Sequence, residues 1–417
     1  GSETVKVTDE TVEATAISDI TAHTNDASVI DLHAMTELTG TDATITNAIN
    51  DLLNRWQNSD VSLWQQHALV LTQTDAATVA FNAHDLANNI DILRGAFGVE
   101  RTDASGIQSV AGDAGNIGWL LSEYDAGLVG LNDGSSPVAM TVTGDWGYVP
   151  DLLWAQSSLS DMGSSIQVSV AEGVLLEGSA AAIVSLLSDP NITLPGDISF
   201  YVDPAYDQNG DLVATSADDL QTILGYTTGP VDATSIASLT GSNAALVYEA
   251  GREVNGQLSL AADVVIEDTT ASVTIADLDA LDAITTGAIT VDATTISGDG
   301  LILASDLGNF QTTGHEAIVV TSALSGADGV AALNVLTAAT DGVVTATISA
   351  TAAELLLLNA GRATNAYAVT VTDSDPVLAS DLLSIQGVID GSLGTVTASA
   401  TSAINGSAQD IQNVLHS

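Results

Sequence analysis

The sequence predicts an α/β fold in which repeated strand–helix units form a parallel-sheet solenoid. Three observations support this fold class. A strand-like run followed by a helix-like run recurs along most of the chain. Equivalent positions of the larger repeat, at residues 178, 241, 298, 350 and 406, lie 63, 57, 52 and 56 residues apart. Aromatic residues make up only 4% of the 417 residues, and a core of small side chains suits thin, regular layers.

The last fifty residues show the repeating unit most clearly. Residues 369–373 have the composition of a strand, and residues 380–385 begin a helical pattern after a turn. Residues 395–398 predict a second strand, and residues 404–411 open a second helix. A half-repeat therefore has about 25 residues, the length of one coil in an α/β solenoid. Strands joined by helices at this spacing should be parallel, with right-handed crossovers.

The repeat divides the chain into three predicted parts. Residues 1–50 hold an N-terminal repeat, residues 51–165 interrupt the period, and residues 166–417 form the main array. The units of this array start near residues 199, 264, 318 and 367. A row of separate small α/β domains is the alternative to one solenoid.

The interrupting segment holds all the tryptophans of the chain. They are Trp56, Trp64, Trp119, Trp146 and Trp154. Apolar residues have helical spacing in residues 45–56 and 77–97, so we expect residues 51–165 to be an inserted, mostly helical domain. Tryptophans most often belong to a core. Exposed ones would indicate a surface that stacks on sugars or contacts another subunit.

Charge is the strongest constraint on partners. The chain has 53 Asp and Glu residues against 6 Lys and Arg residues, a net charge of −47. Nucleic acid and anionic membrane surfaces are therefore poor partners, because both are bound through Lys and Arg. Self-repulsion on this scale calls for divalent cations or a saline medium. Cys is absent, which excludes disulfides, and no apolar run is long enough to span a membrane.

One loop has the ligand spacing of a calcium site. A calcium loop requires oxygen ligands at positions 1, 3, 5 and 12 and a backbone carbonyl at position 7. Residues 207–218 meet this pattern and resemble the calcium loops of dockerins and EF-hands. The ligands that the resemblance implies are the side chains of Asp207, Asn209, Asp211 and Asp218 and the carbonyl of Val213. Leu212 stands where those families have Gly, and an Asx turn with Asp218 as a helix N-cap is the alternative.

Catalysis is not expected from this sequence. The six His residues are scattered, and no HExxH motif, nucleophile elbow or P-loop is present. Glycosidases need paired carboxylates, but acids are so frequent here that any pairing carries little information. We therefore expect a protein that is not an enzyme.

The two ends of the chain carry complementary parts of the repeat. The chain ends on a helix half-repeat at residues 408–415 and begins on the strand that should follow it, at residues 5–9. A solenoid with uncapped ends should stack head-to-tail on further copies, since natural solenoids close their ends with polar caps. Excision from a longer repeat protein explains the same phase, so both explanations stay open.

Segments 231–241, 278–292 and 369–382 suggest a family. With Thr285-Thr286-Gly287 in the second of them, they resemble the Asp/Thr/Ala-rich modules of large secreted bacterial proteins. Those proteins include cyanobacterial and marine adhesins and surface-layer or filament proteins. The resemblance implies an extracellular, cell-surface location and an architectural or adhesive role that often depends on calcium.

Together these patterns predict an extracellular structural protein. It should self-assemble head-to-tail into a filament, sheath or surface layer stabilised by calcium, with copies of itself as partners. One alternative is a calcium-dependent adhesin segment whose inserted domain binds a glycan or surface. Another is a phage fibre or other virion component.

Overall fold

A computed structural model of the protein describes most of the chain. The described residues are 4–24, 29–57, 61–62, 69–75, 80–126, 129–130, 139–153, 166–359, 365–389 and 395–416. They alternate between strands and helices, and the strand pairs are mostly parallel. The α/β class predicted from the sequence is therefore confirmed. No helix among these residues is both long and apolar enough to cross a membrane.

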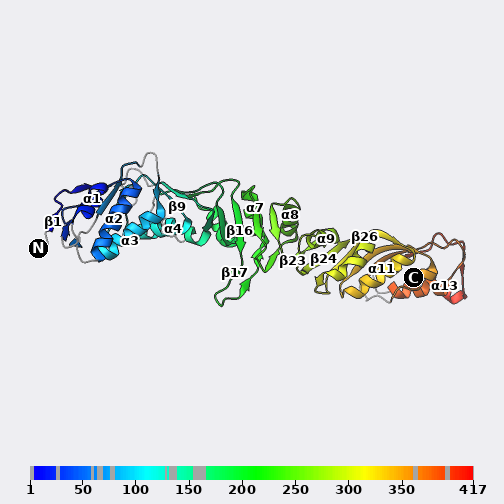
Figure 1. Ribbon diagram of the computed structural model, residues 1–417. Coiled ribbons are helices and arrows are strands. Elements are labelled where there is room, and N and C mark those ends of the chain that lie inside the picture. The colour runs from blue at the N-terminus through cyan, green and yellow to red at the C-terminus, as the bar shows by residue number, and fades with distance from the viewer. Residues whose placement is uncertain are drawn as a thin grey trace. The chain divides into compact units, whose positions relative to one another are not determined.

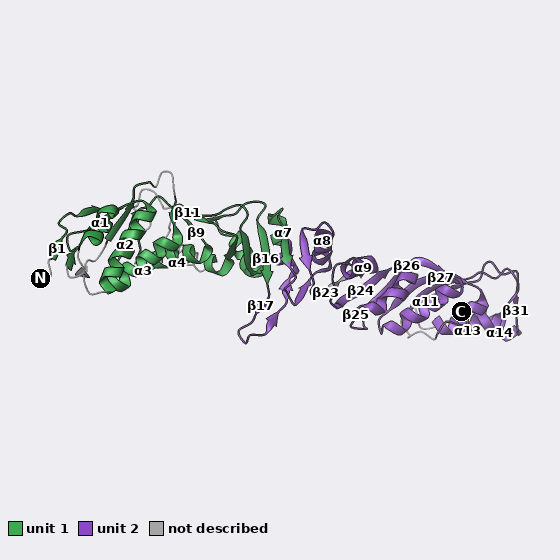
Figure 2. Ribbon diagram, in the orientation of Figure 1, with its two compact units in different colours: residues 1–203, 222–232 green, residues 204–221, 233–417 purple. Residues whose placement is uncertain are grey.

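The chain forms two compact units, which Figure 2 distinguishes by colour. Unit 1 comprises residues 1–203 and 222–232, and unit 2 comprises residues 204–221 and 233–417.

Short parallel strands of unit 1 pair from one repeat to the next. The first sheet contains, in order, β1 (Thr4–Lys6), β3 (Val29–Asp31) and β5 (Val61–Ser62). The second contains β2 (Thr11–Glu13), β4 (Glu37–Gly40), β6 (Leu69–Gln73), β8 (Thr102–Gly106) and β10 (Val129–Gly130). The third contains β7 (Phe81–Asn82), β9 (Ser109–Gly112), β11 (Ala139–Val142), β13 (Val168–Val170) and β15 (Ile192–Thr193). The fourth includes β12 (Trp146–Tyr148), β14 (Leu175–Ser179), β16 (Ser199–Asp203) and β20 (Val231–Ala233).

Helices of unit 1 connect these strands, and the first four of them stack in chain order. They are α1 (Ala14–His23), α2 (Asp42–Gln57), α3 (Ala83–Phe97), α4 (Ala114–Asp125) and α6 (Ala180–Leu187). Helix α7 (Ala217–Tyr226) contains residues of both units. α1 contacts α2, α2 contacts α3 and α3 contacts α4 (Figure 1). This arrangement follows from parallel pairing, because parallel strands need a long crossover connection and a helix supplies it.

Unit 2 is built on a longer parallel sheet. In sheet order its strands are β19 (Thr215–Ser216), β21 (Ser238–Gly241), β23 (Asp263–Thr274), β24 (Ile289–Gly298), β26 (Ala317–Ser325), β27 (Val344–Ala350), β28 (Ala366–Val371) and β30 (Thr395–Thr397). The shorter strands are β17 (Ala205–Tyr206), β18 (Leu212–Val213), β22 (Leu258–Leu260), β25 (Gln311–Thr312), β29 (Val377–Leu378) and β31 (Ile404–Asn405).

The helices of unit 2 also stack in chain order. They are α8 (Asn243–Val254), α9 (Ile275–Asp282), α10 (Gly300–Asp306), the 3₁₀ helix η1 (Leu307–Asn309), α11 (Gly326–Ala339), α12 (Ala352–Leu355), α13 (Ala379–Ile389) and α14 (Ala408–His416). From α8 to α14, each α-helix contacts the next one along the chain. The core lies between the strands and these helices. In β27, for example, Val344, Ala346 and Ile348 are buried while Thr345 and Thr347 are exposed, the alternation that a strand imposes.

Glycines at strand ends explain two of the landmark positions of the repeat, residues 241 and 298. Gly241 ends β21, and an added Cβ would lie 2.5 Å from the Cβ of Ala217, the first residue of α7. Gly298 ends β24, and its Cβ would overlap Ile275, the first residue of α9. At these two positions the start of one repeat's helix therefore lies against the strand end of the next repeat, where a Cβ would overlap it. The equivalent residue at the end of β27 is Ala350.

A second repeated motif, Thr-x-Gly, connects neighbouring repeats through hydrogen bonds. Three of its copies, at residues 227–229, 285–287 and 340–342, lie at the turns before β20, β24 and β27. Buried Thr340 donates its hydroxyl hydrogen to the carbonyl of Glu316 at 2.6 Å and accepts from the N–H of Gly342 at 2.8 Å. The other two copies make the equivalent pairs of hydrogen bonds. In these three copies the motif therefore satisfies backbone groups at the turn before the strand.

Residues 51–165 do not form the separate, mostly helical domain expected from their composition. β6 pairs with β4 on one side and with β8 on the other, so this segment continues a sheet begun by residues 1–50. Its described residues hold strands as well as α3 and α4. The strands were missed because they are short and the strong helical spacing around α3 dominates the sequence pattern.

The tryptophans of this segment lie in different environments. Trp56 and Trp119 are half-buried, and the Arg94 guanidinium lies 6.0 Å from the centre of the Trp119 ring. Trp146 is 49% exposed. Trp64 and Trp154 lie outside the described residues.

Candidate assembly surface

The last repeat of unit 2 has regular structure without a core. β30, β31 and α14 form there, yet none of residues 395–416 is buried. In the preceding repeat, β28 buries Tyr367, Val369 and Val371. The contrast indicates that the last repeat lacks a neighbour on its outer side within the described residues.

Helix α14 is amphipathic but uncovered. Ser407 begins it, accepting the N–H of Asp410 at 3.1 Å and donating to Oδ2 of Asp410 at 2.7 Å. Ile411, Val414 and Leu415 follow at helical spacing and form an apolar face. Leu415 is 73% exposed. Full burial of each aliphatic side chain would contribute about 1.5–3 kcal/mol to the free energy of binding. A partner that covers this face would therefore be bound through apolar contacts.

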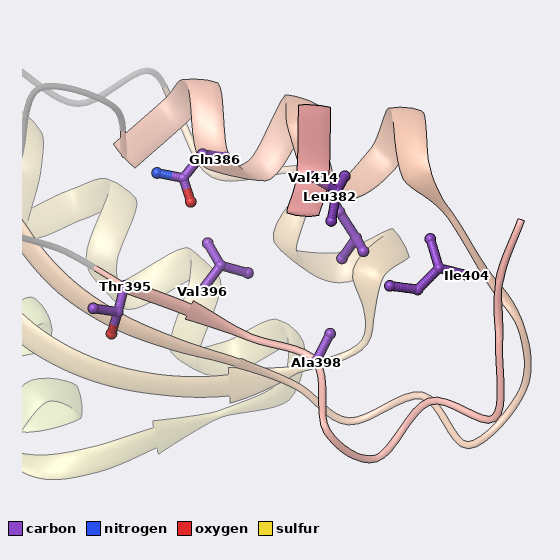
Figure 3. A pocket seen from close by; sticks show the side chains of 7 residues that line it. All are labelled: Leu382, Gln386, Thr395, Val396, Ala398, Ile404 and Val414. Atoms are coloured by element: carbon purple, nitrogen blue, oxygen red, sulfur yellow. The ribbon is translucent and has the colours of Figure 1, made fainter. Parts of the chain in front are cut away.

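A hollow lies beneath this helix. It has a volume of about 430 Å³ and lies among α13, β30, β31 and α14 (Figure 3). The lining residues are Leu382, Gln386, Thr395, Val396, Ala398, Ile404 and Val414. Most of these side chains are apolar, so the hollow suits an apolar occupant better than an ion.

Both the last repeat of unit 2 and the first repeat of unit 1 have open strand edges. β30 pairs with β28 and β31 pairs with β29, and no other described strand continues either pair. At the N-terminal side of unit 1, β1 pairs with β3 and β2 pairs with β4, again with no described strand beyond them. Unpaired N–H and C=O groups at such edges are templates for another chain.

The element order matches at the two edges. β1, β2 and α1 follow each other at the first edge, and β30, β31 and α14 follow each other at the second. The last repeat is also nearly uncharged, because Asp410 is the only acid among residues 395–416. Like-charge repulsion is therefore weaker here than elsewhere on a chain with 53 acids.

The predicted calcium loop forms the tip of an exposed antiparallel hairpin between β17 and β18. Oδ1 of Asp207 accepts hydrogen bonds from the N–H groups of Asn209 at 2.8 Å and Asp211 at 3.0 Å. Nδ2 of Asn209 donates to Oδ2 of Asp207 at 3.1 Å. These bonds, the one from Asp211 first, lower the pKa of Asp207. Residues 207–211 thus form the Asx turn of the alternative, but Asp218 is not the helix N-cap, since it lies within α7 and Ser216 accepts the N–H of Asp219 at 3.4 Å.

The remaining predicted ligands lie further along the chain. Val213 ends β18, and Asp218 lies in the first turn of α7. Among the described residues, no group of three Asp, Glu or His side chains is placed to hold a metal ion. The structure therefore brings Asp207, Asn209 and Asp211 together but does not add Asp218 to them.

The comparisons with known proteins supply no relative. No protein family model, curated protein or solved structure matches this chain.

Three features of the structure were not predicted from the sequence. The apolar face of α14 was detectable, because Ile411, Val414 and Leu415 have helical spacing beside a polar surface. The hollow was not, because it depends on how far α14 lies from β30. Buried Glu249, on α8, also gave no signal among so many acids.

Proposed function

We propose that the protein is an extracellular structural subunit that joins copies of itself head-to-tail. Strand–helix repeats stack within each unit, and assembly would continue such stacking from one molecule to the next. The observation that carries this proposal is the last repeat, which has strands and a helix but no buried residue.

The contact between two copies would extend the pairing already present. β30 and β31 of one molecule pair in parallel with β1 and β2 of the next, and the apolar face of α14 packs on α1 as α13 packs on α14. Such a contact joins two different surfaces, so it produces an open filament unless rotation closes it. In the assembled state, side chains of the next copy would fill the hollow, and its apolar lining would no longer be exposed to water.

Cations support this function by reducing repulsion between copies. Each subunit brings a net charge of −47. Calcium bound at residues 207–211 would neutralise part of it, and the weak calcium sites of extracellular modules, with Kd near 10⁻⁴–10⁻³ M, match the extracellular location that we propose.

Assembly is tested by sedimentation and electron microscopy of the full chain. We expect fibres or higher oligomers in millimolar calcium, and a shift to monomers for Val414→Asp, because a charge in the hollow blocks the apolar contact. Val335→Asp is the matched control, since Val335 is 50% exposed on α11 and lies away from the last repeat. Monomers of the unchanged chain at all concentrations, or equal loss in both variants, would refute the proposal.

Calcium binding has its own test by isothermal titration calorimetry with calcium chloride. We expect a binding event that disappears when Asp207→Asn and Asp211→Asn are combined, because two carboxylates of the loop are then neutral. Asp328→Asn, at an exposed position of α11, should leave the heat unchanged. If the double variant binds calcium like the unchanged chain, the loop is not the site.

A further inference from the structure

One face of the fourth sheet of unit 1 carries an unusual set of side chains. Strand register places Tyr148 opposite Glu177, Glu177 opposite Tyr201, and Tyr201 opposite Asp232. Side chains opposite one another in a parallel sheet point to the same face. The residues directly before and after each of these four along the strands are buried, so this face points outward. Trp146 lies two residues before Tyr148 and therefore on the same face.

The aromatic face consists of Trp146, Tyr148, Glu177, Tyr201, Asp203 and Asp232. It extends over four strands, or three strand spacings of ~4.8 Å each. Trp146 and Tyr148 are 49% and 37% exposed. Two large aromatic rings left in water on one short strand indicate a binding surface.

Hydrogen bonding holds the rings in place. Nε1 of Trp146 donates to Oε2 of Glu177 at 2.5 Å, which fixes the indole against the neighbouring strand. The rings of Trp146 and Tyr148 stack at 22° with centroids 6.1 Å apart. A ligand therefore meets a preformed pair of rings and loses little free energy to ordering them.

Carboxyl groups lie beside the rings. Asp203 follows Tyr201 by two residues on β16 and so lies on the same face. Burial, then repulsion by Glu177 and a hydrogen bond shared with it, raises the pKa of Asp203. The pair offers both a donor and an acceptor to hydroxyl groups when it shares a proton.

We propose that the aromatic face binds a neutral polysaccharide, with sugar rings on Trp146 and Tyr148 and sugar hydroxyls on Glu177, Asp203 and Asp232. The apolar faces of pyranose rings suit flat aromatic side chains, and their hydroxyls suit carboxylates. Uronate or sulfated polysaccharides are excluded, because three acids of the site and a net charge of −47 would repel them. A basic peptide would find acids over the whole chain, whereas the ring pair is what distinguishes this face.

The Glu177–Asp203 pair is expected to bind and not to cleave. Glycosidases hold their two carboxyl groups about 5–9.5 Å apart, on either side of the scissile bond. Glu177 and Asp203 are within hydrogen-bonding reach of each other, which leaves no room for that bond between them. Binding to a glycan would anchor the assembled subunits to a surface, which the assembly proposal alone does not provide.

The test is retention of the full chain on insoluble cellulose and chitin, with alginate as the anionic counterpart and immobilised polylysine as the basic one. We expect retention on cellulose or chitin in 1 M salt and none on alginate. Trp146→Ala and, separately, Tyr148→Ala should each weaken retention by about tenfold or more, as loss of an aromatic anchor does.

Tyr206→Ala is the matched control, because Tyr206 is 63% exposed on the β17–β18 hairpin. Unchanged thermal midpoints would show that the variants fold. Retention only on polylysine, lost in high salt, would assign the face to basic partners and overturn the proposal. So would equal binding by the three variants, or no binding of the unchanged chain to either neutral polysaccharide.

Discussion

Glu249→Gln should raise the free energy of unfolding at pH 8.5 by several kcal/mol while leaving it nearly unchanged at pH 4.5. Glu249 lies on α8 and is fully buried, and neither carboxyl oxygen has a hydrogen-bond partner among the described residues. Burial, with a smaller contribution from repulsion by Asp218, raises its pKa to about 9. The folded protein therefore keeps Glu249 protonated at neutral pH.

The direction of the pH dependence follows from linkage. Below the pKa of an unfolded Glu, about 4.3, both states bind the proton and stability is unaffected. Between pH 4.3 and 9 only the unfolded state releases it, so stability falls as pH rises, by on the order of 3 kcal/mol at pH 7. Gln carries no proton to release, so the substitution removes this dependence of the free energy of unfolding on pH.

Denaturant unfolding at pH 4.5, 7 and 8.5 measures the effect. The control is Glu267→Gln, which changes an exposed acid of the same unit and should keep the slope of the unchanged chain. Parallel pH profiles for the unchanged chain and Glu249→Gln would show that the buried carboxyl is ionised in the folded state.

Much of the fold was predictable because each repeat places characteristic residues at the same points of its strand and turn. Gly241 and Gly298 mark strand ends since a helix start packs there, and Thr-x-Gly marks the turn since its hydroxyl satisfies two backbone groups. Residues 51–165 contain the same strand–helix architecture, but their sequence did not predict it. β9 consists of Ser109–Gly112, and so short a strand of small residues has no period that separates it from a loop.

The sites were harder to predict because they depend on register. Hydrogen bonds within residues 207–211 build the Asx turn, so the local pattern sufficed there. Tyr148, Glu177 and Tyr201 are 29 and 24 residues apart in the chain, and pairing from one repeat to the next brings them together. If the repeat had been recognised in residues 51–165 as well, its register would have placed these three side chains on one face of the sheet. Ring orientation and the hollow beneath α14 require coordinates.

Gly342→Ala is expected to destabilise unit 2 by about 3 kcal/mol or more, a large effect for one methyl group. An added Cβ would overlap the carbonyl oxygen of Glu316 and lie 2.6 Å from its carbonyl carbon and 2.7 Å from the carbonyl oxygen of His315. These are backbone atoms of the preceding repeat and cannot rotate away. Relief requires separating the two repeats, which also breaks the hydrogen bonds of Thr340.

Gly387→Ala provides the control. Gly387 lies on an exposed position of α13, where an added Cβ meets nothing within 4 Å. Ala there should stabilise the helix by about 0.5–1 kcal/mol, so the same substitution has opposite signs at the two sites. Thr340→Val separates the hydrogen bonds from the packing and should cost about 1–3 kcal/mol by leaving the Glu316 carbonyl and the Gly342 N–H unpaired. If Gly342→Ala unfolds at the same denaturant concentration as the unchanged chain, neighbouring repeats are not packed at this turn as the structure has them, and the close stacking on which end-to-end assembly depends would have to be abandoned.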